Sequence, residues 1–116
     1  MNDEEQIVAA VEDYFNGWFD GDAVRMERAL HPDLAKRSLG ANGSADHLTA
    51  AQMIRATAEG IGRTRDPGER QTDVRVVDRH GSIAAVVVDS NVYREYLHLM
   101  RTGDGWRIVN ALWAES

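Results

Sequence analysis

The chain has 116 residues, with 13 Lys and Arg against 19 Asp and Glu, so its formal net charge at pH 7 is −6. This length predicts a single domain, residues 1–116, with one hydrophobic core. The negative charge repels phosphate backbones and anionic lipid surfaces, which argues against a nucleic-acid-binding protein. The chain has no Cys, which excludes disulfides, iron–sulfur clusters and thiol catalysis.

The sequence also argues against a membrane protein. The longest apolar run, residues 83–88, has six residues and is too short to span a bilayer. The acidic start MNDEEQ has neither the basic nor the apolar region of a secretory signal. We therefore expect a cytoplasmic protein.

The first segment predicts a long amphipathic helix. Asn2 or Asp3 can cap it, and Gly21 ends it. Apolar residues recur along it at the three- and four-residue spacing that places side chains on one helix face; they are Ile7, Val11, Tyr14, Phe15 and Trp18. Tyr14 and Trp18 lie four residues apart, so both rings should point toward whatever the helix covers.

Two shorter helices and one strand complete the first half of the chain. Asp22 can cap a helix that runs through Leu30 and stops before Pro32. Residues 34–39 predict a short strand, and the Gly-, Asn- and Ser-rich residues 40–47 predict a loop. Thr49 and Gln52 form a capping-box signature that starts a third helix.

The second half predicts strands. Residues 63–71 are polar and contain Pro67-Gly68, which predicts an exposed loop. Strands are then expected over residues 73–79, 82–91, 95–101 and 106–113, with hairpin turns at His80-Gly81 and at residues 103–105. The order of elements predicts an α+β fold in which three N-terminal helices cover one face of an antiparallel sheet.

The last hairpin determines which side chains share a face. A two-residue turn places His98 opposite Val109 or Ala111. Alternation then predicts one face made of Tyr96, His98, Met100, Val109, Ala111 and Trp113, and another made of Leu97, Leu99, Trp106, Ile108, Asn110 and Leu112. Both faces are largely apolar, so we expect the first to line a pocket under the helices and the second to form a homodimer interface.

Several of these motifs together carry a family resemblance. The run YFNGWFDGD at residues 14–22, the later ALHPDL and the closing LHLMRTGDGWRIVNALW resemble the nuclear transport factor 2-like superfamily, and specifically its lumazine-binding-like branch. The resemblance covers nearly the whole chain. It implies a cone-shaped domain with a curved sheet around a pocket under the first helix, commonly paired as a dimer through the outer sheet face.

The same superfamily includes ketosteroid isomerase, and that similarity suggests site residues. Tyr14 matches the isomerase's oxyanion tyrosine, and His98 matches its second oxyanion donor, a protonated Asp. The isomerase's general base falls near Ser38, where this chain has no carboxylate. Without a base, the isomerase reaction itself is not supported.

These observations lead to a main hypothesis and two alternatives. The main one is a protein that binds a small organic ligand, such as a planar, lumazine-like heteroaromatic compound, between aromatic walls and two orienting polar groups; the residues are Tyr14, Trp18, Tyr96 and Trp113, with Ser38 and His98. The second is an acid–base enzyme of the isomerase, dehydratase or polyketide cyclase type that uses His98 and Tyr14 as catalytic residues. The third is an interaction domain with a vestigial pocket.

The remaining polar residues indicate no cofactor and no metal. His47 and His80 have no partner at metal-ligand spacing. His31, just before Pro32, is expected to interact with a helix C-terminus. Either Lys36 or Arg37 must point inward from its short strand, and the sequence leaves open which one does.

Overall fold

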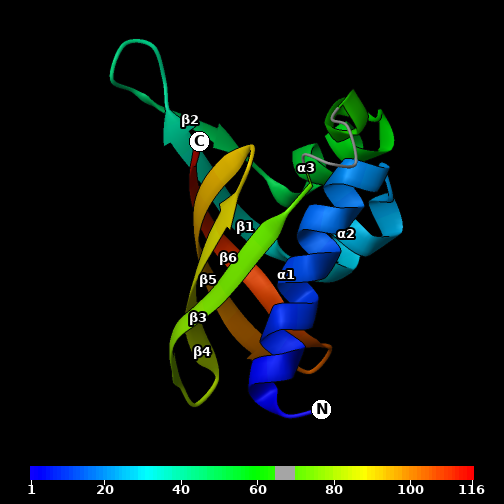
Figure 1. Ribbon diagram of the computed structural model, residues 1–116, viewed down its shortest axis with the longest axis vertical. Coiled ribbons are helices and arrows are strands. Elements are labelled where there is room, and N and C mark those ends of the chain that lie inside the picture. The colour runs from blue at the N-terminus through cyan, green and yellow to red at the C-terminus, as the bar shows by residue number, and fades with distance from the viewer. Residues whose placement is uncertain (65–69) are drawn as a thin grey trace.

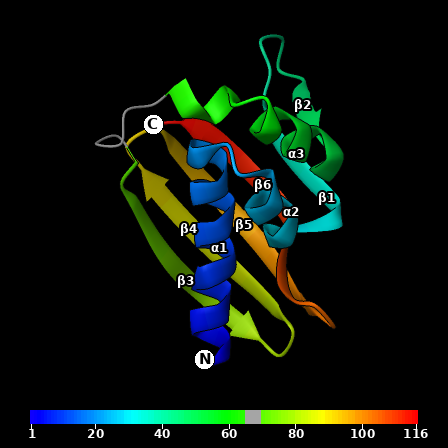
Figure 2. The same cartoon turned by 90° about the vertical axis from the view of Figure 1, so that its right-hand side faces the viewer.

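A layer of helices covers one face of a twisted six-stranded sheet in the computed structural model, which describes residues 1–64 and 70–116 (Figure 1, Figure 2). The helices are α1 (Asp3–Asp20), α2 (Ala23–Ala29), α3 (Ala50–Ala58) and the short 3-10 helix η1 (Ile61–Thr64). The strands are β1 (Leu30–Leu39), β2 (Ala45–Leu48), β3 (Thr72–His80), β4 (Ile83–Ser90), β5 (Tyr93–Thr102) and β6 (Gly105–Glu115). The predicted α+β class is confirmed. Most of the polar loop expected at residues 63–71 lies outside the described residues.

The sheet is mixed, which corrects the prediction of an antiparallel one. Its strand order is β2-β1-β6-β5-β4-β3, and β1 runs parallel to β6 while all other neighbours are antiparallel. The final strand of the β3–β6 meander has a free edge, and the early strand β1 pairs with that edge. Only two of the three main helices precede the first strand, because α3 follows β2.

The helices begin and end where the capping signals predict. Asn2 caps α1 by accepting a hydrogen bond from the Glu5 backbone N–H at 2.8 Å. Gly21 ends α1 in the left-handed conformation, with φ of 68°, which a residue without a side chain adopts at little cost. The capping box of α3 is complete, since Thr49 and Gln52 each accept the other's backbone N–H.

Two segments differ from the sequence predictions near β1. The strand starts at Leu30 rather than residue 34, so His31 lies on a strand and not at a helix end. The pairing with β6 shifts between Leu30 and Ala35, which leaves Pro32 out of the ladder and removes the cost of its missing N–H. Residues 45–48 form β2 against the end of β1, although residues 40–47 were expected as loop; all four are exposed, so their side chains give no alternating pattern.

A bulge in β6 overturns the predicted face assignment. The turn at Gly103-Asp104 does have two residues, because Thr102 pairs with Gly105. Farther along, Leu99 pairs with Ile108 but His98 pairs with Asn110, so Val109 is an extra residue in β6. Strict alternation therefore fails halfway along the hairpin, and the side chains beyond Val109 change face.

The face expected to form a dimer interface is instead the inner face. Four of its predicted members are buried under the helices; they are Leu97, Leu99, Trp106 and Ile108. The bulge adds Ala111 and Trp113 to this inner face and leaves Asn110 and Leu112 outside. The core thus lies between α1 and the sheet, with Ile7, Val11 and Phe19 fully buried on the helix side. No helix among the described residues is long and apolar enough to cross a membrane.

Candidate functional site

A cavity opens between the C-terminal half of α1, α3 and the adjoining ends of β1, β5 and β6. Its volume is about 70 Å³. The walls are mainly aromatic and aliphatic, and two of the lining side chains are charged; the lining residues are Tyr14, Phe15, Trp18, Lys36, Leu48, Met53, Tyr93, Glu95 and Trp113. Tyr93 and Trp113 meet edge to face, with ring centroids 5.5 Å apart.

The polar part of the cavity is a cluster of three side chains from three elements, which we call the Lys36–Tyr14–Glu95 cluster. Tyr14 donates its hydroxyl proton to Glu95 Oε1 at 2.8 Å. Lys36 Nζ donates to Tyr14 Oη and lies 3.7 Å from Glu95 Oε1. The three residues are buried, with exposed fractions of 7% for Lys36 and 2% for both Tyr14 and Glu95.

Aromatic rings also surround the ammonium group. Lys36 Nζ is 4.9 Å from the centroid of the Tyr14 ring and 5.4 Å from that of Trp113. Both distances are within the range in which a cation is attracted to a ring face. Lys36 is therefore oriented by three neighbours at once.

Burial shifts the proton affinities of two cluster members. Desolvation by burial, reinforced by the nearby Glu95 carboxylate, raises the pKa of Tyr14 well above its usual range. Tyr14 consequently stays a hydrogen-bond donor near neutral pH. Desolvation by burial also lowers the pKa of Lys36, although Glu95 opposes the shift. Lys36 therefore loses its proton more readily than a lysine in water does.

Glu95 keeps one oxygen available for another partner. Its Oε1 accepts from Tyr14 and faces Lys36, whereas Oε2 has no hydrogen-bond partner among the described residues. A carboxylate oxygen in an apolar cavity gains from a hydrogen-bond donor, and a ligand N–H can supply one. The cluster can therefore present both an acceptor and donors to a molecule in the cavity.

Three of the six predicted binding residues line this cavity: Tyr14, Trp18 and Trp113. The sequence pattern explains why two of these residues face the cavity, but not why the third does. Tyr14 and Trp18 lie on the predicted stripe of α1, but Trp113 faces inward only because the bulge at Val109 turns it there. The question left open on the first strand is also settled, since Lys36 points inward and Arg37 is exposed.

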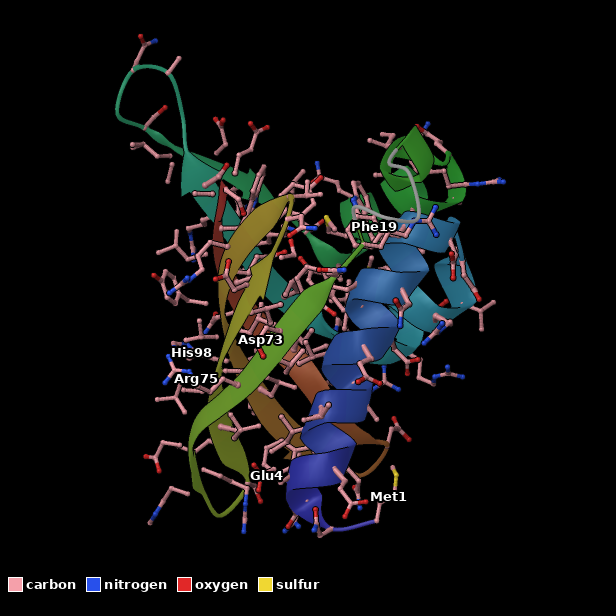
Figure 3. The ribbon with its side chains drawn as sticks, in the orientation of Figure 1. Met1, Glu4, Phe19, Asp73, Arg75 and His98 are labelled. Carbon is pink, nitrogen blue, oxygen red and sulfur yellow. The ribbon has the colours of Figure 1, made fainter. Side chains whose placement is uncertain are left out.

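The other three predicted residues do not line the cavity, which corrects the predicted site. Tyr96 and His98 lie on the outer face, where Tyr96 is 50% exposed and His98 is next to Asn110. The His98 side chain projects from the sheet on the side away from α1 (Figure 3). Ser38 is half-buried two residues beyond Lys36 on β1, outside the lining set. His98 and Tyr14 therefore do not face one cavity within the chain, and the prediction that both line the same pocket is wrong.

Glu95 was not among the predicted site residues, although the sequence carries a signal for it. Glu95 is in phase with Leu97 and Leu99 on β5, so a carboxylate occupies a position where the strand's pattern expects an apolar side chain. A buried carboxylate needs partners, and the Tyr14 hydroxyl also needed one. Matching those two requirements would have indicated the pair. Phe15 lies on the predicted stripe of α1, whereas Tyr93, Met53 and Leu48 carry no comparable signal.

Several solved structures share this arrangement of helices and sheet. The chain is similar to a nuclear transport factor 2-like protein of unknown function from Silicibacter pomeroyi, with 19% identity, full coverage of both chains and a TM-score of 0.73. It is also similar to a nuclear transport factor 2-like protein from Cytophaga hutchinsonii, with 15% identity, full coverage of both chains and a TM-score of 0.70. A third, from Rhodospirillum rubrum, has 18% identity, a TM-score of 0.68, and coverage of 95% of this chain and 98% of that one. These likenesses establish a nuclear transport factor 2-like fold.

Within that superfamily, one family model matches residues 2–114, almost the entire chain, and its description is "Putative lumazine-binding". The chain belongs to this family. The predicted superfamily and its lumazine-binding-like branch are thus confirmed. No curated protein matches the sequence.

Proposed function

We propose that this domain binds a small, planar organic molecule in the cavity under α1. The observation that carries the proposal is the buried Lys36–Tyr14–Glu95 cluster, which faces a space otherwise walled by aromatic rings. Ligand pockets typically combine such apolar walls with a few polar groups that fix the orientation of the ligand. The description of the family points to the same class of ligand.

The cluster favours a particular edge on that ligand. Glu95 Oε2 can accept a hydrogen bond from a ring N–H, while Lys36 Nζ can donate to an adjacent ring carbonyl. A heteroaromatic ring with an N–H beside a C=O has this pattern, and lumazine carries it. Tyr93 and Trp113 would then contact the ring system beyond that edge.

The size of the cavity favours a compact ligand. Its volume of about 70 Å³ is well below the roughly 300 Å³ at the lower end of drug-binding pockets. One or two fused rings would fill it with one edge at the cluster and the other at the open mouth. Leu48, which is 36% exposed at the rim, can move to admit a wider ring.

Titration of the protein with lumazine, followed by tryptophan fluorescence, tests this proposal. Trp18 and Trp113 line the cavity, so a stacked ligand should quench their emission. Glu95→Gln should weaken binding by about 1.5–3 kcal/mol, because a hydrogen bond to a charged acceptor is lost. Glu115→Gln, at the exposed end of β6, is the matched control and should bind as the unmodified protein does.

Two outcomes would contradict the proposed ligand class. One is the absence of saturable quenching by lumazine and by related lactam-containing heterocycles. The other is unchanged affinity in both Glu95→Gln and Trp18→Leu, provided that circular dichroism shows both variants to be folded. Trp18 is half-buried at the cavity wall, so its replacement disturbs the core less than that of a fully buried residue.

We also propose that the protein is a homodimer, now through the true outer face of the sheet. Large apolar side chains are exposed there at fractions between 39% and 56%; they are Val77, Ile83, Tyr96, Met100 and Leu112. A two-fold interface would cover this patch with a copy of itself. Light scattering should give about twice the 12.9 kDa chain mass.

Charged substitutions distinguish this face from other exposed apolar residues. Leu112→Glu on the outer face should produce a monomer, because the interface would bury an unpaired carboxylate. Val24→Glu replaces a 72% exposed residue of α2, on the helix side, and should leave the mass unchanged. A native protein with the mass of one chain would refute the dimer.

A further inference from the structure

The chemistry of the chain's cations singles out one position. Of the 13 Lys and Arg residues, Lys36 is the single lysine and the other twelve are arginines. A guanidinium stays protonated in proteins, whereas a lysine amine can lose its proton and become a nucleophile. The chain therefore has one side-chain amine, and it is in the cavity.

The surroundings of Lys36 differ from those of a structural ion pair. Arg25 and Arg28 pair with Asp13 at 3.0 Å and retain 31% and 59% side-chain exposure, so water shares in their solvation. Lys36 instead has two aromatic rings beside it and a carboxylate at 3.7 Å. Its position combines burial, a proton acceptor and a proton donor around one amine.

We propose that Lys36 is a nucleophilic amine that condenses with a small apolar aldehyde or ketone in this cavity to form an imine. The inference rests on the proposed function only in requiring that the cavity admits a small organic molecule. It goes beyond that function because it assigns a covalent step and a second class of ligand. Aromatic walls favour a carbonyl compound with an aromatic or short aliphatic substituent.

The cluster contains the groups that this condensation needs. Glu95 can take a proton from the Lys36 ammonium and free the lone pair on Nζ. That lone pair forms a C–N bond with the carbonyl carbon while the C=O π electrons move to oxygen. Tyr14, which remains protonated, can hydrogen-bond to the oxygen as it gains negative charge.

The second half of the reaction releases water. An Nζ proton first moves to the oxygen and gives the neutral carbinolamine. Its hydroxyl then takes up the proton held by Glu95, the C–O bond breaks, water leaves, and the Nζ lone pair forms the C=N bond. The last Nζ proton of this iminium passes to the Glu95 carboxylate and leaves the imine. One amine and one carbonyl thus give one imine and one water, so no oxidant or reductant is needed.

A purely structural role for Lys36 makes the opposite prediction about reactivity. An amine that only neutralises Glu95 would be shielded by the fold and would react with aldehydes more slowly than in the unfolded chain. A nucleophilic Lys36 would react faster when folded. Each unit by which a lysine pKa falls makes its free amine about ten times more abundant at neutral pH.

Reductive trapping separates these roles without any substitution. The protein is incubated at neutral pH with benzaldehyde and sodium cyanoborohydride, once folded and once in guanidinium chloride, and benzylation is followed by peptide mass spectrometry. The α-amine of Met1, which is 79% exposed, is the internal reference on the same chain. We expect Lys36 to be labelled severalfold faster in the folded protein, relative to Met1, than in the unfolded chain.

Variants then test the assignment of the groups. Lys36→Arg retains the charge but cannot form an imine, so only the Met1 amine should be labelled. Tyr14→Phe should slow labelling of Lys36 severalfold, whereas Tyr96→Phe on the outer face should not. Lys36 that is protected in the folded protein, or a labelling rate that neither folding nor Tyr14→Phe changes, would overturn the proposal.

The same samples distinguish this proposal from the proposed function. Saturable lumazine quenching together with a protected Lys36 would leave the binding function intact and refute imine formation. Rapid labelling of Lys36 in a protein that lumazine does not quench would support the amine and refute the heteroaromatic ligand. If both proposals hold, saturating lumazine should slow the benzylation of Lys36, since the two ligands would share one cavity.

Discussion

The Lys36–Tyr14–Glu95 cluster should make the fold less stable than an apolar core of the same volume would. Replacing one member alone should nevertheless lower the stability, because its partners would stay buried without it. At an effective dielectric constant of about 20, charges 3.7 Å apart attract by roughly 4.5 kcal/mol. Removing two such ions from water costs several kcal/mol each, so the attraction does not outweigh the desolvation. A pair with this balance contributes little net stability.

Single and combined substitutions should therefore have opposite effects. Lys36→Met leaves the Glu95 carboxylate buried without its counter-ion and should lower the free energy of unfolding by about 3–5 kcal/mol. The triple variant Lys36→Met, Tyr14→Phe, Glu95→Met removes every polar group of the cluster at similar volume. It should unfold within about 1 kcal/mol of the unmodified protein, or be more stable.

Urea unfolding followed by circular dichroism measures these differences. Arg55→Met is the matched control, because Arg55 pairs with Glu59 on the surface at 3.1 Å with 84% of its side chain exposed. That variant should change the free energy of unfolding by less than about 0.5 kcal/mol. A triple variant as unstable as Lys36→Met would show that the fold requires the polar cluster, and would refute the expected balance of attraction and desolvation.

Two further predictions concern residues away from the cluster. The hydrogen bond from Trp106 Nε1 to Asp3, reinforced by Arg101, lowers the pKa of Asp3 below its usual range. Ionised Asp3 therefore stabilises the fold above about pH 4, and this stabilisation is lost as the pH falls through the folded-state pKa. In Asp3→Asn, the urea midpoint should consequently depend less on pH in the acid range. Equal acid sensitivity in both proteins would contradict this. Gly62→Ala would place a Cβ 2.4 Å from the Trp18 carbonyl oxygen and should lower the free energy of unfolding by about 1–3 kcal/mol. Gly103→Ala is the control, because its Cβ would have no atom within 4 Å, and it should leave the stability almost unchanged. Equal urea midpoints for the two variants would refute the close contact at Gly62.

Local signals in the sequence determined the elements and most of their boundaries. The caps at Asn2, Asp22 and Thr49 act through hydrogen bonds to backbone groups within three residues, so they can be predicted without knowledge of the rest of the chain. The stripe on α1 likewise placed Tyr14 and Trp18 on the side of the sheet, because helix periodicity depends only on spacing. The α+β class followed from these elements.

The composition of the site was decided by tertiary structure. One extra residue, Val109, exchanges the faces of β6 beyond it, and no glycine marks this bulge. Along β5 the alternation holds and groups His98 with Tyr96 and Met100, but alternation does not decide which group faces the helices, and the group expected inside lies outside. The parallel pairing of β1 with β6 joins strands about 75 residues apart, which no local pattern encodes.

The charged cluster shows the same division between local and long-range information. Glu95 and Tyr14 are 81 positions apart, and Lys36 is 22 positions from Tyr14. Each is recognisable in the sequence only as a polar residue on a strand or an apolar helix face. The cost of burying these polar groups is offset only when all three are together, because each supplies the hydrogen bond or opposite charge that another lacks. The sequence alone specified that Tyr14 faces inward from its helix, because helix periodicity is local. The long-range pairing of the sheet decided that its partners are Glu95 and Lys36.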